Sequence, residues 1–382
     1  MHKIIFISLF LISFISLESF GCTSAIIGAD MNPSGRTLLW KLRDTSNTDN
    51  KIEYVESQDG THAYVALFNA GDKQLEEAWM GMNDVGFAIM NTASYNIKDD
   101  NIPENEMDKE GFLMTTALKN CVTVNDFAHL LESLPKPLGV EANFGVIDAY
   151  GNGAYFETNN YDFVKYDLKD SPNHVLIRTN YSHSGRDNEG YGFVREKNAE
   201  CLLTPYIESR NITPEILTEN ISRSFYHSLF QKDFLNDEEE WIIDQDFIPR
   251  YKSTATIVIE GCKPLISNQV PNEDFIKDQY IMWTGMGYPP CSQIIPVWCS
   301  NEGVSSLLRG LQKDGHSEMC DIVKKRRDEV FPIHKGNGDK YINKKALVNK
   351  EENGYIQILV PQNKEVYRKI SEKRDINENN NR

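Results

Sequence analysis

The chain has 382 residues, of which 40% are hydrophobic, and 56 Asp and Glu outnumber 40 Lys and Arg to give a formal net charge of −16. The apolar fraction excludes a disordered chain. The negative charge argues against a nucleic-acid partner, because a nucleic acid is also anionic and would be repelled. After the N-terminus no apolar run reaches the about 20 residues that a bilayer-spanning helix needs. No transmembrane segment is therefore predicted.

Residues 1–21 are typical of a secretory signal peptide. A basic Lys3 precedes an apolar stretch over residues 4–17, and small residues stand just before Cys22. The stretch is interrupted by serines and is short for a membrane anchor. We therefore expect cleavage after Gly21, a secreted or periplasmic protein, and a mature chain that begins at Cys22.

Two interpretations compete for Cys22. The Gly21-Cys22 pair resembles a bacterial lipidation box, although Ser19 stands where such a box prefers Leu. Cys22 would then anchor a surface binding protein to a lipid. Alternatively, Cys22 is an N-terminal nucleophile that carries a thiol and a free α-amine on one residue. The two exclude each other, because lipidation alkylates the sulfur and acylates the amine.

The predicted elements follow in blocks. In chain order we expect strand hairpins over 23–44, 52–68, 79–91 and 144–158, two helices within 111–134 that break near residues 121–123, strands over 161–168 and 174–180, helices over 193–203 and 213–225, strands over 253–261 and 280–287, and a helix over 317–331. Strands in adjacent hairpins favour packed antiparallel sheets with covering helices, an α+β fold, over alternating βαβ units. One domain over 22–366 is expected, followed by a polar, frayed tail over 367–382.

The cysteine count and the absence of common motifs limit the kinds of catalytic site that the sequence supports. Besides Cys22 there are six cysteines, which permit up to three disulfides in an exported protein: Cys121, Cys201, Cys262, Cys291, Cys299 and Cys320. No CxxC or HExxH spacing supports a metal site, and no phosphate-loop or GxGxxG fingerprint supports a nucleotide cofactor. No GxSxG nucleophile elbow is present either. We therefore expect no metal and no cofactor, and the Cys22 thiol is the strongest catalytic candidate.

An N-terminal cysteine carries its own general base. The reference pKa of an α-amine, about 7.7 to 8.0, lies close to the thiol reference of about 8.5. The amine can therefore accept the thiol proton directly or through a water, and the thiolate can attack a carbonyl to give an acyl-enzyme.

The opening segment CTSAIIGADMNPSGRTLLWKLRDT over 22–45 resembles the cysteine N-terminal nucleophile (Ntn) hydrolases, the group of choloylglycine hydrolase, penicillin V acylase, acid ceramidase and isopenicillin-N acyltransferase. Looser similarity continues through GMNDVGFAIMNT, IRTNYS, GYGFVREKNAECLL and MWTGMGYPPCSQIIPVW, so it covers most of residues 22–300. The resemblance implies a four-layer αββα sandwich and cleavage of a linear, non-peptide amide bond in an N-acylated small molecule. It equally allows transfer of the acyl group to an amine, and it leaves a homo-oligomer open.

The resemblance also assigns roles to charged residues of the opening hairpin. Asp44 matches the aspartate that holds the N-terminal amine, as a carboxylate does if it favours the cationic form of that base. Lys41 stands where choloylglycine hydrolases and ceramidases carry an Arg that stabilises the thiolate, and Arg43 is a rival for that role. A cation near Cys22 would lower the thiol pKa.

Three further site residues follow from the same resemblance. Asn91 and Asn180 match amide donors to the oxyanion, and Arg195 matches an arginine near the nucleophile. Asn180 also begins a glycosylation sequon, Asn-Tyr-Ser. His183 and His227 are alternative bases of a papain-like peptidase, which the absence of CGSCW surroundings disfavours.

Overall fold

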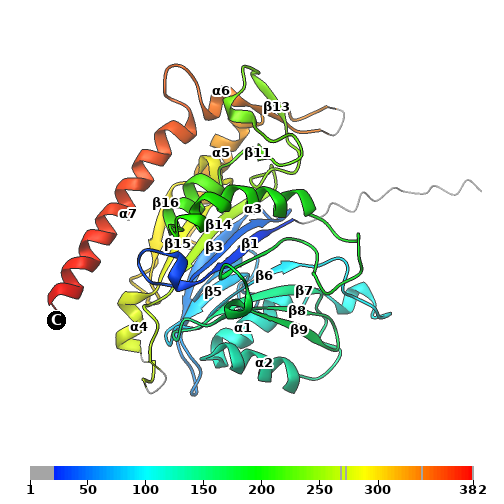
Figure 1. Ribbon diagram of the computed structural model, residues 1–382, viewed down its shortest axis with the longest axis vertical. Helices are drawn as coiled ribbons and strands as arrows, with labels where there is room; N and C mark the ends of the chain where they lie inside the picture. The colour runs from blue at the N-terminus through cyan, green and yellow to red at the C-terminus, as the bar shows by residue number, and fades with distance from the viewer. Residues whose placement is uncertain (1–20, 267–268, 272, 337–338, 381–382) are drawn as a thin grey trace, which may run out of the picture.

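Two antiparallel sheets packed face to face form the centre of the structure (Figure 1), a computed structural model that describes residues 21–266, 269–271, 273–336 and 339–380. The signal peptide expected over 1–21 lies outside these residues except for Gly21. The first sheet has six strands, in the order β10 (Val175–Arg178), β1 (Thr23–Ile27), β2 (Leu38–Asp44), β14 (Ser253–Glu260), β15 (Ile281–Met286) and β16 (Ile294–Val297). The second has seven in chain order, β3 (Asn50–Val55), β4 (Tyr64–Asn69), β5 (Met80–Asn83), β6 (Ala88–Ala93), β7 (Ala142–Ile147), β8 (Gly153–Thr158) and β9 (Phe163–Asp167).

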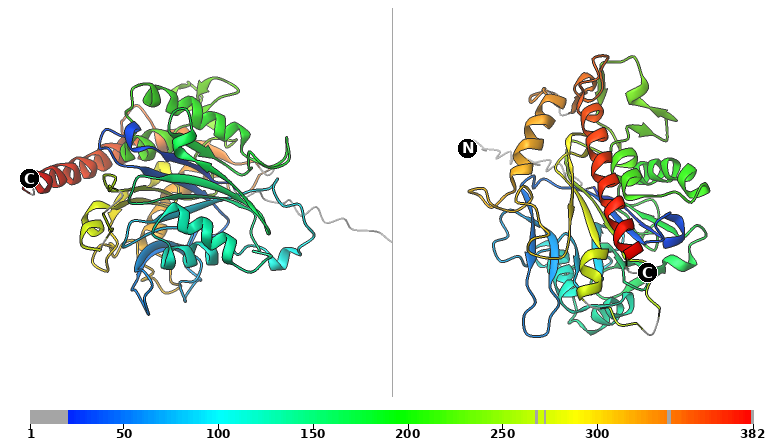
Figure 2. Two further views of the ribbon diagram at one scale, coloured as in Figure 1. Left: turned by 60° about the horizontal axis from the view of Figure 1, so that its bottom comes forward. Right: turned by 90° about the vertical axis from the view of Figure 1, so that its left-hand side faces the viewer.

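Helices cover the two outer faces (Figures 1 and 2). α1 (Glu110–Asn120) and α2 (Val124–Ser133) pack on the second sheet, while α3 (Phe193–Glu208), a π-helical turn over Ile216–Ile221 and α7 (Tyr355–Asn380) lie over the first. The expected αββα sandwich is therefore confirmed. The remaining elements are α4 (Glu273–Gln279), α5 (Glu318–Val330), α6 (Lys344–Leu347) and two short ladders, β11 (Tyr226–His227) with β12 (Lys232–Asp233) and β13 (Trp241–Ile243) with β17 (Tyr341–Asn343).

The break between α1 and α2 falls where the sequence predicted it. The Thr123 hydroxyl accepts the backbone N–H of Asp126 at 3.1 Å, and the Asp126 carboxylate accepts the backbone N–H of Thr123 at 2.8 Å. This reciprocal capping box satisfies the free N–H groups at the start of α2. Thr123 therefore begins a new helix and does not continue α1.

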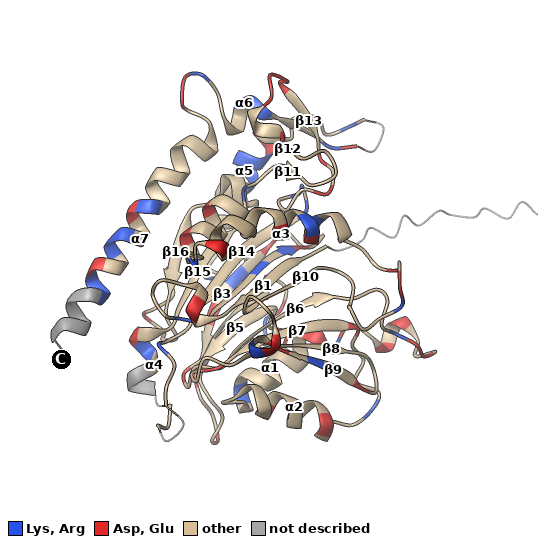
Figure 3. Ribbon diagram, in the orientation of Figure 1, with Lys and Arg blue, Asp and Glu red and all other residues tan. Residues whose placement is uncertain are grey.

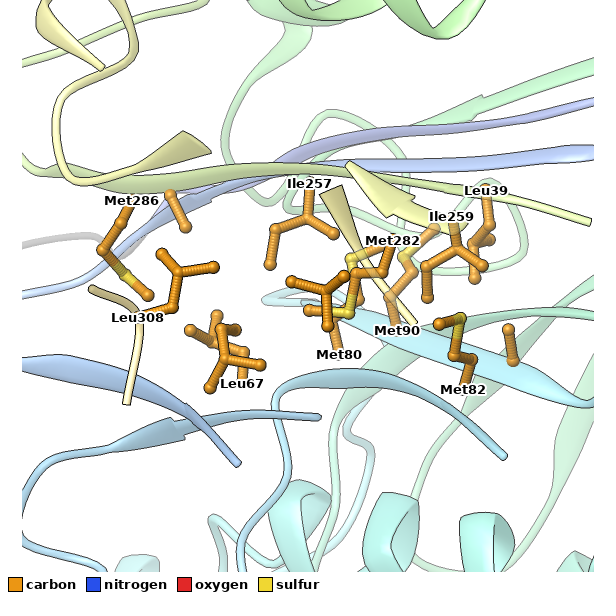
Figure 4. Packing of buried hydrophobic residues seen from close by; sticks show 14 of the residues in the cluster. Leu39, Leu67, Met80, Met82, Met90, Ile257, Ile259, Met282, Met286 and Leu308 are labelled. Atoms are coloured by element: carbon orange, nitrogen blue, oxygen red, sulfur yellow. The ribbon is translucent and has the colours of Figure 1, made fainter. Parts of the chain in front are cut away.

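The space between the sheets is an apolar core (Figure 4). Ile257 and Met282 of the first sheet point toward Met80 and Met90 of the second, and all four are at most 1% exposed. Flexible methionine side chains fill the irregular gap between two twisted sheets. This packing fixes the separation of the sheets, and hence of any residues that meet between them.

The C-terminal segment differs from the expectation of a frayed tail beginning at residue 367. α7 runs through this position to Asn380, and Tyr367 is 8% exposed and stacks on Trp283 of β15 with ring centroids 4.4 Å apart. The polar composition concealed the helix, because Lys, Arg and Glu residues occupy its exposed face (Figure 3) while a few apolar residues anchor it. Among the described residues, no helix is both long and apolar enough to cross a bilayer.

The structure contains none of the three disulfides that the cysteine count permits. All seven cysteines lie in the described part of the chain, and all except Cys201 are buried. Most lie within the apolar clusters, where a free cysteine packs as a small hydrophobic residue.

Candidate active site

Cys22 lies immediately before β1, at one end of the space between the sheets. β1 pairs with β2 so that Thr23 opposes Leu42 and Ser24 opposes Lys41. Because side chains alternate along a strand, Cys22 shares the inner face with Ser24 and with Ile26, which belongs to the inter-sheet core. Cys22 is 8% exposed. The local hairpin therefore turns the thiol toward the second sheet.

Asp44 lies at the end of β2 and is bound on both carboxylate oxygens. Its Oδ1 accepts the Ser253 hydroxyl at 2.6 Å, and its Oδ2 accepts Arg250 Nε at 2.9 Å and Nη2 at 2.6 Å. The Asp44 side chain is fully buried. Arg250 Nη2 also donates to the carbonyl of Gly21 at 3.2 Å. Arg250 thereby connects the Asp44 carboxylate to the peptide bond that precedes Cys22.

Arg250 was missed by the sequence analysis. It lies in a loop, in the stretch RYKSTA, which carries no recognisable motif. Burial by itself would lower the pKa of Arg250, but the charge and hydrogen bonds of Asp44 raise it above its usual value. Only the pairing of Ser253 with Asp44 across β14 and β2 brings this arginine to the site.

Three buried cations interact electrostatically with Cys22: Lys41, Arg43 and Arg195. Burial lowers the pKa of Lys41 to about 8, and the charge of Cys22 opposes this shift. Burial also lowers the pKa values of Arg43 and Arg195 to about 10, again against the effect of Cys22. Lys41 and Arg43 were rival candidates for the cation beside the thiol, and both interact electrostatically with Cys22.

Lys41 and Arg43 have different hydrogen-bond partners. Arg43 donates to the amide oxygens of Asn50 at 2.6 Å and Asn69 at 2.9 Å, and its guanidinium lies 5.0 Å from the centre of the Trp79 ring. Lys41 Nζ instead donates to Asn91 Oδ1 at 2.8 Å and to the backbone oxygen of Trp79 at 2.9 Å. Lys41 therefore reaches from the first sheet to an expected oxyanion donor on the second.

Asn180 and Arg195 meet on the other side of Cys22. Arg195 Nη2 donates to Asn180 Oδ1 at 2.9 Å, while its Nη1 donates to the backbone oxygen of Cys22 at 2.5 Å and to the Thr23 hydroxyl at 3.1 Å. Asn180 Nδ2 donates to the backbone oxygen of Ala93 at 2.9 Å. Hydrogen bonds thus join Lys41 to Asn91, and Arg195 to both Asn180 and Cys22, while Asp44 reaches the site only through Arg250.

The two histidines proposed as alternative bases are engaged elsewhere. His183 Nε2 lies 2.8 Å from Glu196 Oε1, and His227 packs against Phe230 and Phe247. No hydrogen bond in the described part of the chain joins either ring to Cys22. Nor do the described residues contain a cluster of three or more His, Cys, Asp or Glu that could hold a metal.

Gly21 occupies the space beside Cys22. A Cβ atom at this position would lie 1.8 Å from Arg250 Nη2 and 2.8 Å from Arg195 Nη2, so its backbone fits directly against both guanidinium groups. Cavities of 680, 520 and 650 Å³ open elsewhere on the molecule, and Cys22 lines none of these three.

Comparison with known proteins gives structural similarity without sequence matches. No protein-family model matches the chain, and no curated protein sequence matches it. An N-acylethanolamine-hydrolyzing acid amidase ortholog from Caenorhabditis elegans is 14% identical with a TM-score of 0.42, over 68% of this chain and 98% of that one. A conjugated bile acid hydrolase variant from Clostridium perfringens is 12% identical with a TM-score of 0.39, over 73% and 92%. Penicillin V acylase from Agrobacterium tumefaciens is 11% identical with a TM-score of 0.36, over 72% and 86%.

The bile acid hydrolase and the penicillin V acylase belong to the group that the sequence resembles. At these identities and TM-scores, the similarity supplies no residue roles. The function proposed below therefore rests on the residues around Cys22.

Proposed function

We propose that this protein is an exported N-terminal nucleophile amidase that cleaves a linear amide bond of an N-acylated small molecule through an acyl-Cys22 intermediate. One observation carries the proposal: Arg250 joins the buried Asp44 to the Gly21 carbonyl, and Arg195 joins Asn180 to the Cys22 carbonyl. Lys41, which interacts electrostatically with Cys22, binds Asn91. A structural core has no use for so many buried charges at one strand end.

Removal of the residues up to Gly21 would create the reactive group. Cleavage of the Gly21-Cys22 bond frees the α-amine of Cys22, and it vacates the space that Gly21 fills beside Arg195 and Arg250. Arg250 Nη2 binds both the Gly21 carbonyl and Asp44 Oδ2, so the Asp44 carboxylate lies close to the position of the new amine. Glycine at this position fits the proposal, because a larger residue would collide with both arginines.

The reaction follows from the groups present. The α-amine accepts the Cys22 thiol proton, and the thiolate attacks the amide carbonyl to form a tetrahedral oxyanion. Amide N–H groups of Asn91 and Asn180 donate to this oxyanion, where preorganised neutral donors are most effective. As the intermediate collapses, the C–N bond breaks, the α-ammonium returns the proton to the leaving amine, and an acyl thioester remains on Cys22. Water activated by the α-amine then adds to the thioester, and the acid and the free thiol are released.

The alternatives identified from the sequence remain as outcomes of the test. A diacylglyceryl group on Cys22 would have to be accommodated at a sulfur that faces the space between the sheets, which argues against a lipidated binding protein. An acyltransferase would use the same site and differ only in the acceptor, an amine in place of water.

Two versions of the protein test the proposal: a mature form that begins at Cys22 and a matched form that retains one residue, Gly21. Both are incubated with a panel of N-acyl amides, and free amine is measured. We expect release only from the form with a free Cys22 α-amine, because in the extended form the Cys22 nitrogen is a non-basic amide. Equal activity of the two forms would contradict the proposal and favour a conventional cysteine–histidine pair. Activity that requires an added amine acceptor would identify the transferase.

A further inference from the structure

Each of the two candidate oxyanion amides is bound, through its oxygen, to a cation. Lys41 Nζ donates to Asn91 Oδ1 at 2.8 Å, and Arg195 Nη2 donates to Asn180 Oδ1 at 2.9 Å. Lysine and arginine have donors only and cannot accept a hydrogen bond from an amide N–H. Either amide, if rotated by 180°, would direct its own donors at a cation. The cation therefore decides which end of the amide faces the site.

This constraint has a direct chemical consequence. With the oxygens held by cations, Asn91 Nδ2 makes no hydrogen bond to a described residue, and Asn180 Nδ2 uses one N–H for the Ala93 carbonyl and keeps the other. Both amides thus retain an N–H for a developing oxyanion. Without Lys41, the Asn91 oxygen loses this donor, and the amide is free to rotate.

We propose that Lys41 is a positioning residue that acts through Asn91, fixing the amide so that its N–H groups face the reacting carbonyl. This inference rests on the proposed function and refines it. It differs from the role that the resemblance suggests for Lys41, direct stabilisation of the thiolate. Arg195 makes the corresponding contact with Asn180, but it also holds the Cys22 carbonyl, so Lys41 offers the cleaner test.

A double-mutant cycle in the mature protein distinguishes the two roles of Lys41. We expect Lys41→Met to lower kcat by about 10- to 100-fold with little change in KM, below the about 10²- to 10³-fold effect of losing an oxyanion donor outright. In an Asn91→Ala background the same substitution should lower kcat by less than about 2-fold, because the amide that Lys41 orients is absent. An equal loss in both backgrounds would overturn the proposal. Lys41→Arg, which keeps the donor, should restore much of the activity.

Thiol reactivity gives an independent readout. The rate of Cys22 alkylation by iodoacetamide should fall much less than kcat in Lys41→Met, since Arg43 and Arg195 remain near the sulfur. A fall as large as that of kcat would place the action of Lys41 on the thiolate and contradict the proposal.

Lys51→Met is a matched control for folding. Lys51 is a buried lysine on β3 whose Nζ donates to backbone carbonyls, at 2.7 Å to Asp72, and not to a site amide. The control should lose stability while its kcat stays within about 2-fold of wild type. A kcat loss in the control equal to that in Lys41→Met would show a general folding effect and overturn the proposal.

A spectroscopic experiment tests the proposal without turnover, and so remains decisive even if no acyl amide is cleaved. In Cys22→Ser protein labelled with ¹⁵N-asparagine, the Asn91 side-chain signal should titrate with Lys41 and lose that titration in Lys41→Arg. The other groups that interact with Lys41 are Arg43, which stays charged, and Glu110, which Glu110→Gln removes as a control. An Asn91 side-chain signal whose pH dependence is the same with Lys41 and with Lys41→Arg would overturn the proposal. Absence of turnover with a normal titration would instead count against the proposed function.

Discussion

The strands β1 and β2 pass through two contrasting regions of the same inter-sheet space. In the middle of the sandwich, Ile26 and Leu39 are fully buried in an apolar cluster. Figure 4 shows Leu39 among the residues of this cluster. At the end of the same strands, Cys22, Lys41 and Arg43 are almost as deeply buried, yet they carry a thiol and two cations.

The two regions contribute differently: the apolar region stabilises the fold, and the charged region is suited to catalysis. Buried apolar side chains stabilise the fold, by about 1.5–3 kcal/mol each relative to exposed ones. Buried cations cost free energy, as the lowered pKa values of Lys41 and Arg43 show. Charges retained at such a cost are expected at a functional site. Substitutions in the charged region should therefore lower activity more than stability, and those in the apolar region should lower stability more than activity.

Loss of the nucleophile should have the largest effect. Cys22→Ser retains the size of the side chain but replaces the sulfur by a weaker nucleophile. We expect kcat/KM for amine release to fall by about 10³-fold or more, as for the loss of other catalytic nucleophiles, with little change in melting temperature. Near wild-type turnover would contradict the assignment of Cys22.

The next largest effect is expected at Asp44. Asp44→Asn keeps the shape but removes the charge that pairs with Arg250, and we expect a fall in kcat of about 10²-fold, with a loss of stability of about 1–3 kcal/mol. Glu219→Gln is a matched control, because Glu219 forms a similarly buried pair with Arg223 at 3.1 Å, on the other face of the first sheet. The control should lose comparable stability in urea unfolding and retain its kcat. Equal kcat losses in both variants would refute a specific role for Asp44.

In the apolar region the pattern should reverse. Met282→Ala creates a cavity between the sheets, and we expect the free energy of unfolding to fall by about 2–5 kcal/mol. The kcat per folded molecule should stay within about 2-fold of wild type, since Met282 belongs to the apolar cluster between the sheets. A large kcat loss at full folding would show that the two regions are not separable.

Much of this contrast could be predicted from the sequence, because it depends on local patterns. The apolar segments of the opening hairpin predicted two strands, and a helix break was predicted near residues 121–123; the structure confirms both. Arg250, the Lys41–Asn91 contact and the C-terminal half of α7 could not be predicted in this way. Each depends on segments far apart in the chain, such as Tyr367 packing on Trp283, and a short-range pattern carries no signal for such contacts.

The smallest expected effect is a pH dependence at Glu110, at the start of α1. Burial raises the pKa of this carboxyl from 4.5 to about 7, so the folded protein binds more protons than the unfolded chain between these pH values. Stability should therefore fall as the pH rises from about 4.5 to 7, by about 2–3 kcal/mol. Melting temperatures across this range should show the decline in wild type and a smaller one in Glu110→Gln. Identical pH profiles would argue against a buried, protonated Glu110.

The central claim, that Cys22 acts with its own free amine, is tested most directly by the mass of the protein quenched during turnover of an acyl amide. The account predicts an N-terminal peptide that begins at Cys22 and carries one acyl group on the sulfur, which hydroxylamine removes. An acyl group on another residue, or an active protein whose Cys22 amine is blocked by lipid or by preceding residues, would contradict it.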